Sequence, residues 1–170
     1  MRATTRPLTP PEWSIVKDLR LFALKTEPGV FVSSFDSEAI LSPEEWQETI
    51  QGDDHQVFGL FDGERLIGLT AVFTSRDDPS GQTALLAYSF IHPQYRGLGL
   101  SRLLYKARLD WVKSRPEFMR IVVSHRASNE RSQRAILRHG FVPSGEAERT
   151  WPDGTTDGEI FYDMSLHASG

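Results

Sequence analysis

The hydrophobic and polar positions follow a helical period near the start of the chain. Apolar residues recur every three or four positions in a first predicted helix, residues 9–24: Ile15, Val16, Leu19, Phe22 and Ala23. Thr9, two prolines and Glu12 form a capping sequence at its start. A second, shorter helix is predicted from Ser42 to Gly52, because Ser-Pro-Glu-Glu opens that segment.

The pattern then changes to that of strands. Apolar segments at 56–61 and 64–73 flank Asp-Gly, which is typical of a two-residue hairpin turn. A buried strand is predicted at 83–91, followed by a helix whose apolar residues share one face: Leu100, Leu103, Leu104, Ala107 and Trp111. The remaining predicted elements are a buried strand at 118–123, a helix within 129–141, and strands at 141–150 and 159–166. This order indicates an α/β fold with a mixed sheet and helices on its faces.

Length and composition limit the class of protein. We expect one domain over residues 1–170, with a core from about 6 to 166. The net charge of −4 argues against a general nucleic-acid binder. Without cysteine there is no thiolate metal site, and five scattered histidines do not suggest another metal site. The sequence has no membrane-spanning or signal-like segment, so a cytoplasmic protein without a membrane partner is expected.

Glycines occur where the predicted strand 83–91 leads into the next helix, in the sequence Arg-Gly-Leu-Gly-Leu-Ser, residues 96–101. Glycine has no Cβ, so its backbone can approach a ligand closely. The first turn of a helix offers free amides and the positive end of the helix dipole, which together favour phosphate. The lysine of a Walker loop and the third glycine of a dinucleotide fingerprint are both missing. The segment is therefore either a different phosphate site or only a tight turn.

Two segments resemble motifs of the GNAT N-acetyltransferase superfamily. "HPQYRGLGLSRLL" is similar to its pyrophosphate-binding motif, with Arg96, Gly99 and Ser101 at the three defined positions. Ser101 departs from the usual Gly or Ala but remains small. "NERSQRAILRHGF", residues 129–141, resembles the second motif, in which Asn precedes a helix that ends in Gly-Phe. Its spelling is closest to the Rim-type ribosomal-protein and spermidine acetyltransferase subgroup.

The resemblance implies a mostly antiparallel sheet with a central, splayed pair of parallel strands at 84–91 and 118–124, and helices on both faces. Acetyl-CoA would lie in the wedge between these strands, without a metal. Amides of residues 96–101 would bind the pyrophosphate, and the end of the first strand would hydrogen-bond the pantetheine arm. The implied cofactor-binding residues are Phe90, Ile91, Arg96, Gly97, Leu98, Gly99, Leu100, Ser101, Asn129 and Ser132.

The resemblance also implies an enzyme that transfers an acetyl group by direct attack of a primary amine on the thioester in a ternary complex. Ile136 stands where many relatives have a tyrosine as the acid, so Ser132 is the candidate acid, with water as the alternative. Residues 83–94 contain no carboxylate to act as the base. The candidates for the base are Tyr88, Ser124, His92, Asp157 and Glu159, besides a chain of waters. His125 is expected to face away from Ser124.

The acceptor site implied by the resemblance comes from residues 31–48 and 150–162. The candidate wall residues are Phe31, Phe35, Trp46 and Trp151, and the candidate acids for an ammonium group are Glu38, Asp153 and Asp157. The acceptor would be a small-molecule amine or a protein N-terminal amine, and a homodimer is possible. A catalytically silent acyl-CoA-binding sensor is the alternative, because Ile136 and the strand without a carboxylate both favour it.

Overall fold

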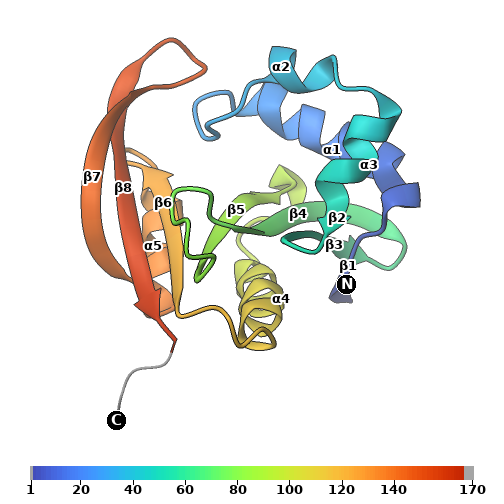
Figure 1. Ribbon diagram of the computed structural model, residues 1–170. Helices are drawn as coiled ribbons and strands as arrows, with labels where there is room; N and C mark the ends of the chain where they lie inside the picture. The colour runs from blue at the N-terminus through green and yellow to red at the C-terminus, as the bar shows by residue number, and fades with distance from the viewer. Residues whose placement is uncertain (1, 167–170) are drawn as a thin grey trace.

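The computed structural model describes residues 2–166, which form an eight-stranded sheet flanked by helices (Figure 1). The strands are β1 (Ala3–Pro7), β2 (Gln51–Gly52), β3 (His55–Asp62), β4 (Arg65–Thr74), β5 (Thr83–Ile91), β6 (Arg120–Arg126), β7 (Val142–Thr150) and β8 (Thr156–Ser165). Their order is β1-β3-β4-β5-β6-β8-β7, and β2 pairs with β3. Within the described residues β5 and β6 are parallel and the other pairs are antiparallel. The predicted mixed sheet is confirmed.

Helices cover both faces of the sheet, as predicted (Figure 1). They are α1 (Trp13–Thr26), α2 (Phe35–Ala39), α3 (Pro43–Ile50), α4 (Ser101–Lys113) and α5 (Glu130–Arg138), with short 3-10 turns at Pro10–Glu12 and Pro93–Tyr95. On the first face, Val16 of α1 packs with Val57 and Leu69 of the sheet. On the second face, helices α4 and α5 pack against β5 and β6 through one core cluster. No helix in residues 2–166 is long and apolar enough to cross a lipid bilayer.

β2 occupies the predicted end of the second helix, and two further elements, β1 and α2, have no counterpart in the predicted pattern. β1 is an edge strand of sequence Ala-Thr-Thr-Arg-Pro, which lacks the apolar alternation of a core strand. Helix α2 has only five residues, too few to show a helical period, and begins where the Ser34 side chain accepts a hydrogen bond from the Ser37 amide at 3.2 Å. Both elements are therefore short or polar pieces that hydrophobic periodicity does not detect.

The predicted apolar face of α1 is partly wrong, because the helix buries Arg20. Ile15 and Phe22, predicted to face the core, are 42% and 37% exposed, whereas Arg20 is 3% exposed. Its guanidinium makes two hydrogen bonds to Glu38 of α2, at 3.0 Å from Nε and 2.9 Å from Nη2. It also stacks on Tyr88, with Cζ 3.9 Å from the ring centre. The ion pair fixes α2 against α1. As a result, the buried face of α1 includes a charged residue and differs from the face predicted from its apolar residues.

A similar shift affects α4. Its buried residues are Leu104, Tyr105, Arg108 and Val112, while the predicted Ala107 and Trp111 are only partly buried. A second arginine thus lies on the inner face of a helix, at a position where an apolar residue is usual.

The buried pair predicts a large loss of stability when one partner is removed. In Glu38→Ala, Arg20 would keep a buried charge without its partner, a change that costs about 3–5 kcal/mol. Urea denaturation should show a loss of this size in the free energy of unfolding. Glu48→Ala, at an exposed position of α3, should stay within about 0.5 kcal/mol of the wild type. A loss below about 1 kcal/mol for Glu38→Ala would contradict the assigned role of the pair.

Candidate active site

The parallel strands β5 and β6 separate soon after they pair. They pair at only three positions, the last being Leu85 opposite Val122. Further along, the β4–β5 register shifts where Tyr88 adopts a φ of 67°, in the left-handed region that non-glycine residues seldom occupy. A bulge of this kind bends its strand. The end of β5 therefore turns away from β6, and a wedge opens between the strands.

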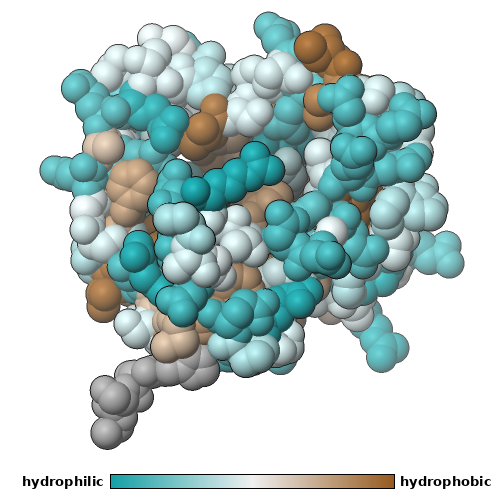
Figure 2. Space-filling view, in the orientation of Figure 1, coloured by the Kyte–Doolittle hydropathy of each residue, from teal (hydrophilic) through white to brown (hydrophobic). Residues whose placement is uncertain are grey.

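A cavity of about 870 Å³ fills this wedge. Its lining comes from β5, β6, β7, β8, α1, α4, α5, the segment after α1 and the segment between β4 and β5. Figure 2 shows apolar side chains in a hollow between the α1–α2 side and the β7–β8 side of the molecule, framed by hydrophilic ones. The splayed parallel pair expected from the sequence is thus present, and it borders a space large enough for a substrate.

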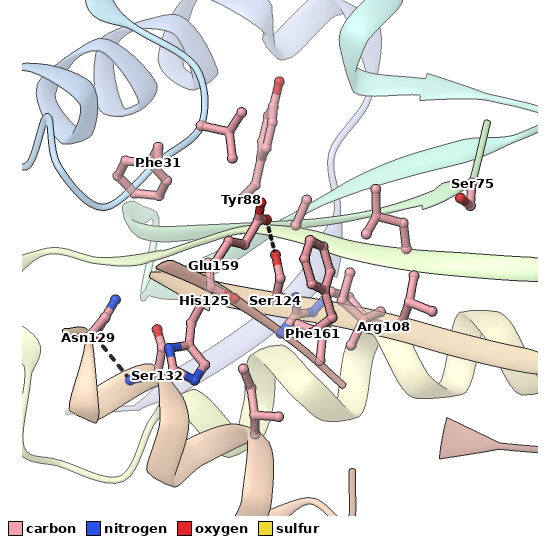
Figure 3. A pocket seen from close by; sticks show the side chains of 18 of the residues that line it. Phe31, Ser75, Tyr88, Arg108, Ser124, His125, Asn129, Ser132, Glu159 and Phe161 are labelled. Atoms are coloured by element: carbon pink, nitrogen blue, oxygen red, sulfur yellow. Dashed lines mark hydrogen bonds between the residues drawn. The ribbon is translucent and has the colours of Figure 1, made fainter. Parts of the chain in front are cut away.

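Two predicted catalytic residues meet in this cavity (Figure 3). The Ser124 hydroxyl donates a 2.6 Å hydrogen bond to Oε2 of Glu159, and Nε of Arg149 donates one of 2.8 Å to Oε1. Glu159 is 4% exposed. Each carboxylate oxygen can accept a second hydrogen bond, so Glu159 still has room for a proton from water or an amine. The geometry suits a general base.

The Tyr88 side chain does not join the Ser124–Glu159 pair. Its hydroxyl extends away from the Ser124–Glu159 pair, toward the helices of the first face (Figure 3). Burial raises the pKa of Tyr88, with Glu38 adding to the effect and the nearby Arg20 opposing it. The phenol therefore stays protonated at neutral pH, and a role of Tyr88 in proton transfer stays a prediction.

His92, a candidate base, and His125, which lines the cavity, both have partners that fix their rings. His125 lies on the opposite face from Ser124: Nδ1 donates to the Arg126 carbonyl at 2.6 Å, and Nε2 accepts from the Tyr162 hydroxyl at 2.8 Å. The ring of His92 stacks on Phe22 at 5.0 Å, and its Nδ1 accepts a hydrogen bond from the Gln94 amide. Both rings have structural partners.

Helix α5 presents the remaining predicted residues. Asn129 caps the helix, with its Oδ1 accepting a hydrogen bond from the Ser132 amide at 3.2 Å. The cavity is lined by Asn129, Ser132 and Ile136, of which Ser132 and Ile136 lie one turn apart on the helix. Ile136 cannot donate a proton, whereas the Ser132 hydroxyl can. A role for Ser132 as the acid stays a prediction.

The glycine-rich corner is built as an open backbone surface. Gly97 and Gly99 have φ values of 79° and 72°, and a Cβ on either would meet nothing within 4 Å. The amides of residues 97–101 donate to no acceptor among the described residues, whereas the Arg96 amide, predicted to bind with them, donates to the Pro93 carbonyl at 3.3 Å. Because α4 begins at Ser101, the positive end of its dipole lies at the same place. The corner therefore fits a pyrophosphate, although these residues do not line the cavity itself.

The side chain of Arg96 attaches the glycine-rich corner to neighbouring elements. Its Nε donates to the Ile91 carbonyl at 2.9 Å, and its Nη1 lies 2.7 Å from a Glu27 oxygen at the end of α1. The guanidinium also covers the ring of Phe90, 5.4 Å from its centre. Arg96 thus holds the loop against β5 and α1, while Phe90 and Ile91 connect the loop to the wedge.

The predicted acceptor walls are partly wrong. Phe31 and Trp151 line the cavity, but Phe35 and Trp46 do not. Trp46 is 1% exposed, and its apolar surface is used for packing. Phe35 packs beside Phe31 in a separate cluster.

The acids expected to attract an ammonium group already have cationic partners. Glu38 is bound by Arg20. Asp153 and Asp157 both bind Arg126, at 2.7 Å and 3.0 Å. Arg126 also donates to the Gly29 carbonyl at 2.8 Å, so it joins the β7–β8 turn to the loop after α1. The sequence analysis did not predict a role for Arg126. Its position at the end of a buried strand was the feature that could have indicated one.

No group of three or more His, Asp or Glu residues within 2–166 is arranged to hold a metal ion.

Comparisons with known proteins agree with this geometry. The model of the Acetyltransferase (GNAT) family matches residues 20–141. A GNAT-family acetyltransferase from Streptococcus pneumoniae superposes with a TM-score of 0.82 at 17% identity, covering 97% of this chain and 100% of its own. The protein yncA from Salmonella typhimurium, solved with acetyl-CoA, gives 0.81 at 16% identity and coverages of 100% and 98%. RimL in complex with coenzyme A gives 0.78 at 16% identity and coverages of 98% and 96%. No curated protein sequence matches the chain.

The open corner predicts that a side chain at Gly99 blocks coenzyme A. Gly99→Val should abolish the stabilisation by coenzyme A, which adds about 2.7 kcal/mol at 100 times the Kd. Gly81→Val is a matched control, because Gly81 has a φ of 74° and equally open surroundings. Both variants should lose about 1–3 kcal/mol from backbone strain, and only Gly99→Val should lose binding. Thermal-shift titration measures this; retained binding by Gly99→Val would refute the placement.

The Arg126 bridge predicts a pH dependence on the acid side. Hydrogen bonds from Thr155 and then Arg126 lower the pKa of Asp153 to about 2, below the ordinary value of about 3.9. A lowered folded-state pKa stabilises the protein above about pH 4, and this stability is lost as the pH falls toward about 2. The melting temperature of Asp153→Asn should therefore fall less steeply between pH 4 and pH 2 than that of the wild type. An identical slope would contradict the lowering of the Asp153 pKa by Thr155 and Arg126.

Proposed function

The chain belongs to the acetyltransferase (GNAT) family, and we propose that it transfers the acetyl group of acetyl-CoA to a primary amine by direct attack in a ternary complex. The observation that carries the proposal is the Ser124–Glu159 pair inside the wedge between β5 and β6. The open amides of residues 97–101 lie at the end of the loop that follows β5, and they suit the pyrophosphate of the donor.

The proposed reaction balances without a covalent enzyme intermediate. The amine nitrogen attacks the thioester carbon, the C–N bond forms and the C–S bond breaks. Sulfur leaves with the electron pair of that bond, and the amine loses a proton. Glu159 is the proposed base for this proton, since its carboxylate lies in the cavity and keeps acceptor capacity. Ser124 and Arg149 hold the carboxylate in position.

The leaving thiolate needs a proton or a donor. Ser132 is the proposed donor, supported by its place on the cavity wall at the first turn of α5. Ile136, one turn further, has no acidic hydrogen to offer. Water at the same place is the alternative donor, so loss of the Ser132 hydroxyl is expected to have a smaller effect than loss of the Glu159 carboxylate.

The acceptor is a primary amine on a small molecule or at a protein N-terminus. Phe31 and Trp151 form apolar parts of the cavity wall along which the amine would approach. The neighbour RimL is described as a ribosomal L7/L12 alpha-N-protein acetyltransferase, which supports including peptide N-termini in an acceptor screen.

The assignment of the base predicts a selective loss of turnover. Glu159→Gln should lower kcat by about 10²–10⁴-fold while the KM for acetyl-CoA changes little, because the base acts in the transition state. Glu148→Gln removes an exposed acid on the neighbouring strand β7 and should leave kcat unchanged. Release of free thiol with a panel of amines and peptides provides the measurement.

A second function is a silent acyl-CoA sensor, which is favoured by Ile136 at the place of the acid. Saturable coenzyme A binding without thiol release by the wild type across the whole panel would support the sensor. Unchanged kcat in Glu159→Gln would instead leave acetyl transfer intact and remove Glu159 as its base.

A further inference from the structure

Arg108 is a buried cation in the wall of the cavity. It projects from α4, is 1% exposed and lines the wedge (Figure 3). Its Nε donates a long hydrogen bond of 3.3 Å to the Leu104 carbonyl, and Cζ lies 4.6 Å from the ring centre of Tyr105. Its Nη2 is buried without a hydrogen-bond partner. No carboxylate within residues 2–166 forms an ion pair with it.

A buried arginine without an ionic partner is energetically unfavourable. Taking a charge out of water is unfavourable unless a partner compensates it, and apolar residues of similar size usually serve packing better. Burial lowers the pKa of Arg108 to about 10, with Tyr105 opposing the shift, and this value still leaves the guanidinium protonated near neutral pH. The site therefore holds a positive charge that has no partner among residues 2–166.

None of the carboxylates that line the cavity forms an ion pair with Arg108; they are Asp77, Asp78, Glu159 and Asp163. Glu159 is bound by Arg149, and Asp163 by Arg120. On β6 and β8, Glu159 and Asp163 stand opposite Arg126 and Val122, the strand positions that alternate with Val123. Side chains alternate between the two faces of a strand, so both acids point away from the face on which Val123 packs with α4.

The position of Arg108 indicates which ligand would supply the partner. Helix α4 begins at the glycine-rich corner and packs against β5, with Leu86 and Val123 in the same core cluster as its Tyr105. These residues lie next to Leu85 and Val122, where the strands begin to separate. An acyl-CoA anchored at the corner and directed into the wedge would point its acyl end at this closed apex, toward Arg108.

We propose that Arg108 binds a carboxylate at the free end of the acyl chain, so that the protein prefers CoA thioesters of dicarboxylic acids over neutral acyl-CoAs. The planar guanidinium can donate two parallel hydrogen bonds to a carboxylate, which a neutral chain cannot accept. This inference rests on the proposed function and replaces acetyl-CoA with a dicarboxylic acyl-CoA as the preferred donor. The transfer reaction is unchanged, and the distal carboxylate stays intact in the product.

Binding measurements test the proposal without knowledge of the acceptor. Kd values are measured by calorimetry for coenzyme A and for pairs with equal carbon number: malonyl- and propionyl-CoA, succinyl- and butyryl-CoA, glutaryl- and pentanoyl-CoA. The wild type should bind the charged member of at least one pair at least tenfold more tightly. Arg108→Met should lose this preference but bind coenzyme A like the wild type. Lys106→Gln, at an exposed position of the same helix, should keep the preference for the charged acyl chain.

Stability in the absence of ligand gives a second readout. Arg108→Met should melt at the same or a higher temperature than the wild type, because it removes an uncompensated buried charge. If this variant does not fold, Arg108→Lys takes its place. That variant keeps a charge but loses the planar fork, so its preference should shrink without disappearing.

Several outcomes would overturn the proposal. Equal Kd values within every pair would do so, as would a preference that persists in Arg108→Met. A third is an effect of Arg108→Met on the KM of carboxylated amines relative to their amides, with acetyl-CoA as donor, which would assign the carboxylate to the acceptor. Coenzyme A binding without discrimination rejects only this inference, whereas absence of coenzyme A binding rejects the proposed function with it.

Discussion

The short parallel pairing between β5 and β6 is the constraint on which the site depends. Two strands that paired along their whole length would leave no space in the middle of the sheet. Here the pairing ends at Leu85 and Val122, and the left-handed conformation of Tyr88 bends β5 away. Such a conformation is strained, and the Tyr88 ring that it places in this region stacks with Arg20. The result is a cavity whose lining includes residues from both faces of the sheet.

Arginines organise the charges around that cavity. Arg20 joins α1 to α2 through Glu38, and Arg126 joins the β7–β8 turn to the loop after α1. Arg149 holds the carboxylate of Glu159, the proposed base. In each case a fixed guanidinium positions a group that would otherwise be free to move. Arg108 differs, because its partner is not supplied by the described part of the protein.

The fold and the glycine-rich corner follow from the sequence because their signals are local. Strand and helix periods fix the order of the main elements, and the family motifs identify the corner. The contact between Ser124 and Glu159 could not be derived in the same way. It depends on the β6–β8 register, which joins residues 35 positions apart. The inner arginines were missed because periodicity treats arginine as polar, although Arg108 lies four residues from both Leu104 and Val112 in a buried row.

The central claim is that the wedge between β5 and β6, with the loop that follows β5, is the acyl-CoA site. Amide hydrogen exchange with and without acetyl-CoA tests it directly, because it reports protection segment by segment. The account predicts slower exchange in peptides covering residues 86–101 and 122–132, while β1, β2 and β3 remain unchanged. Protection confined to other segments, or no protection at saturating acetyl-CoA, would contradict it.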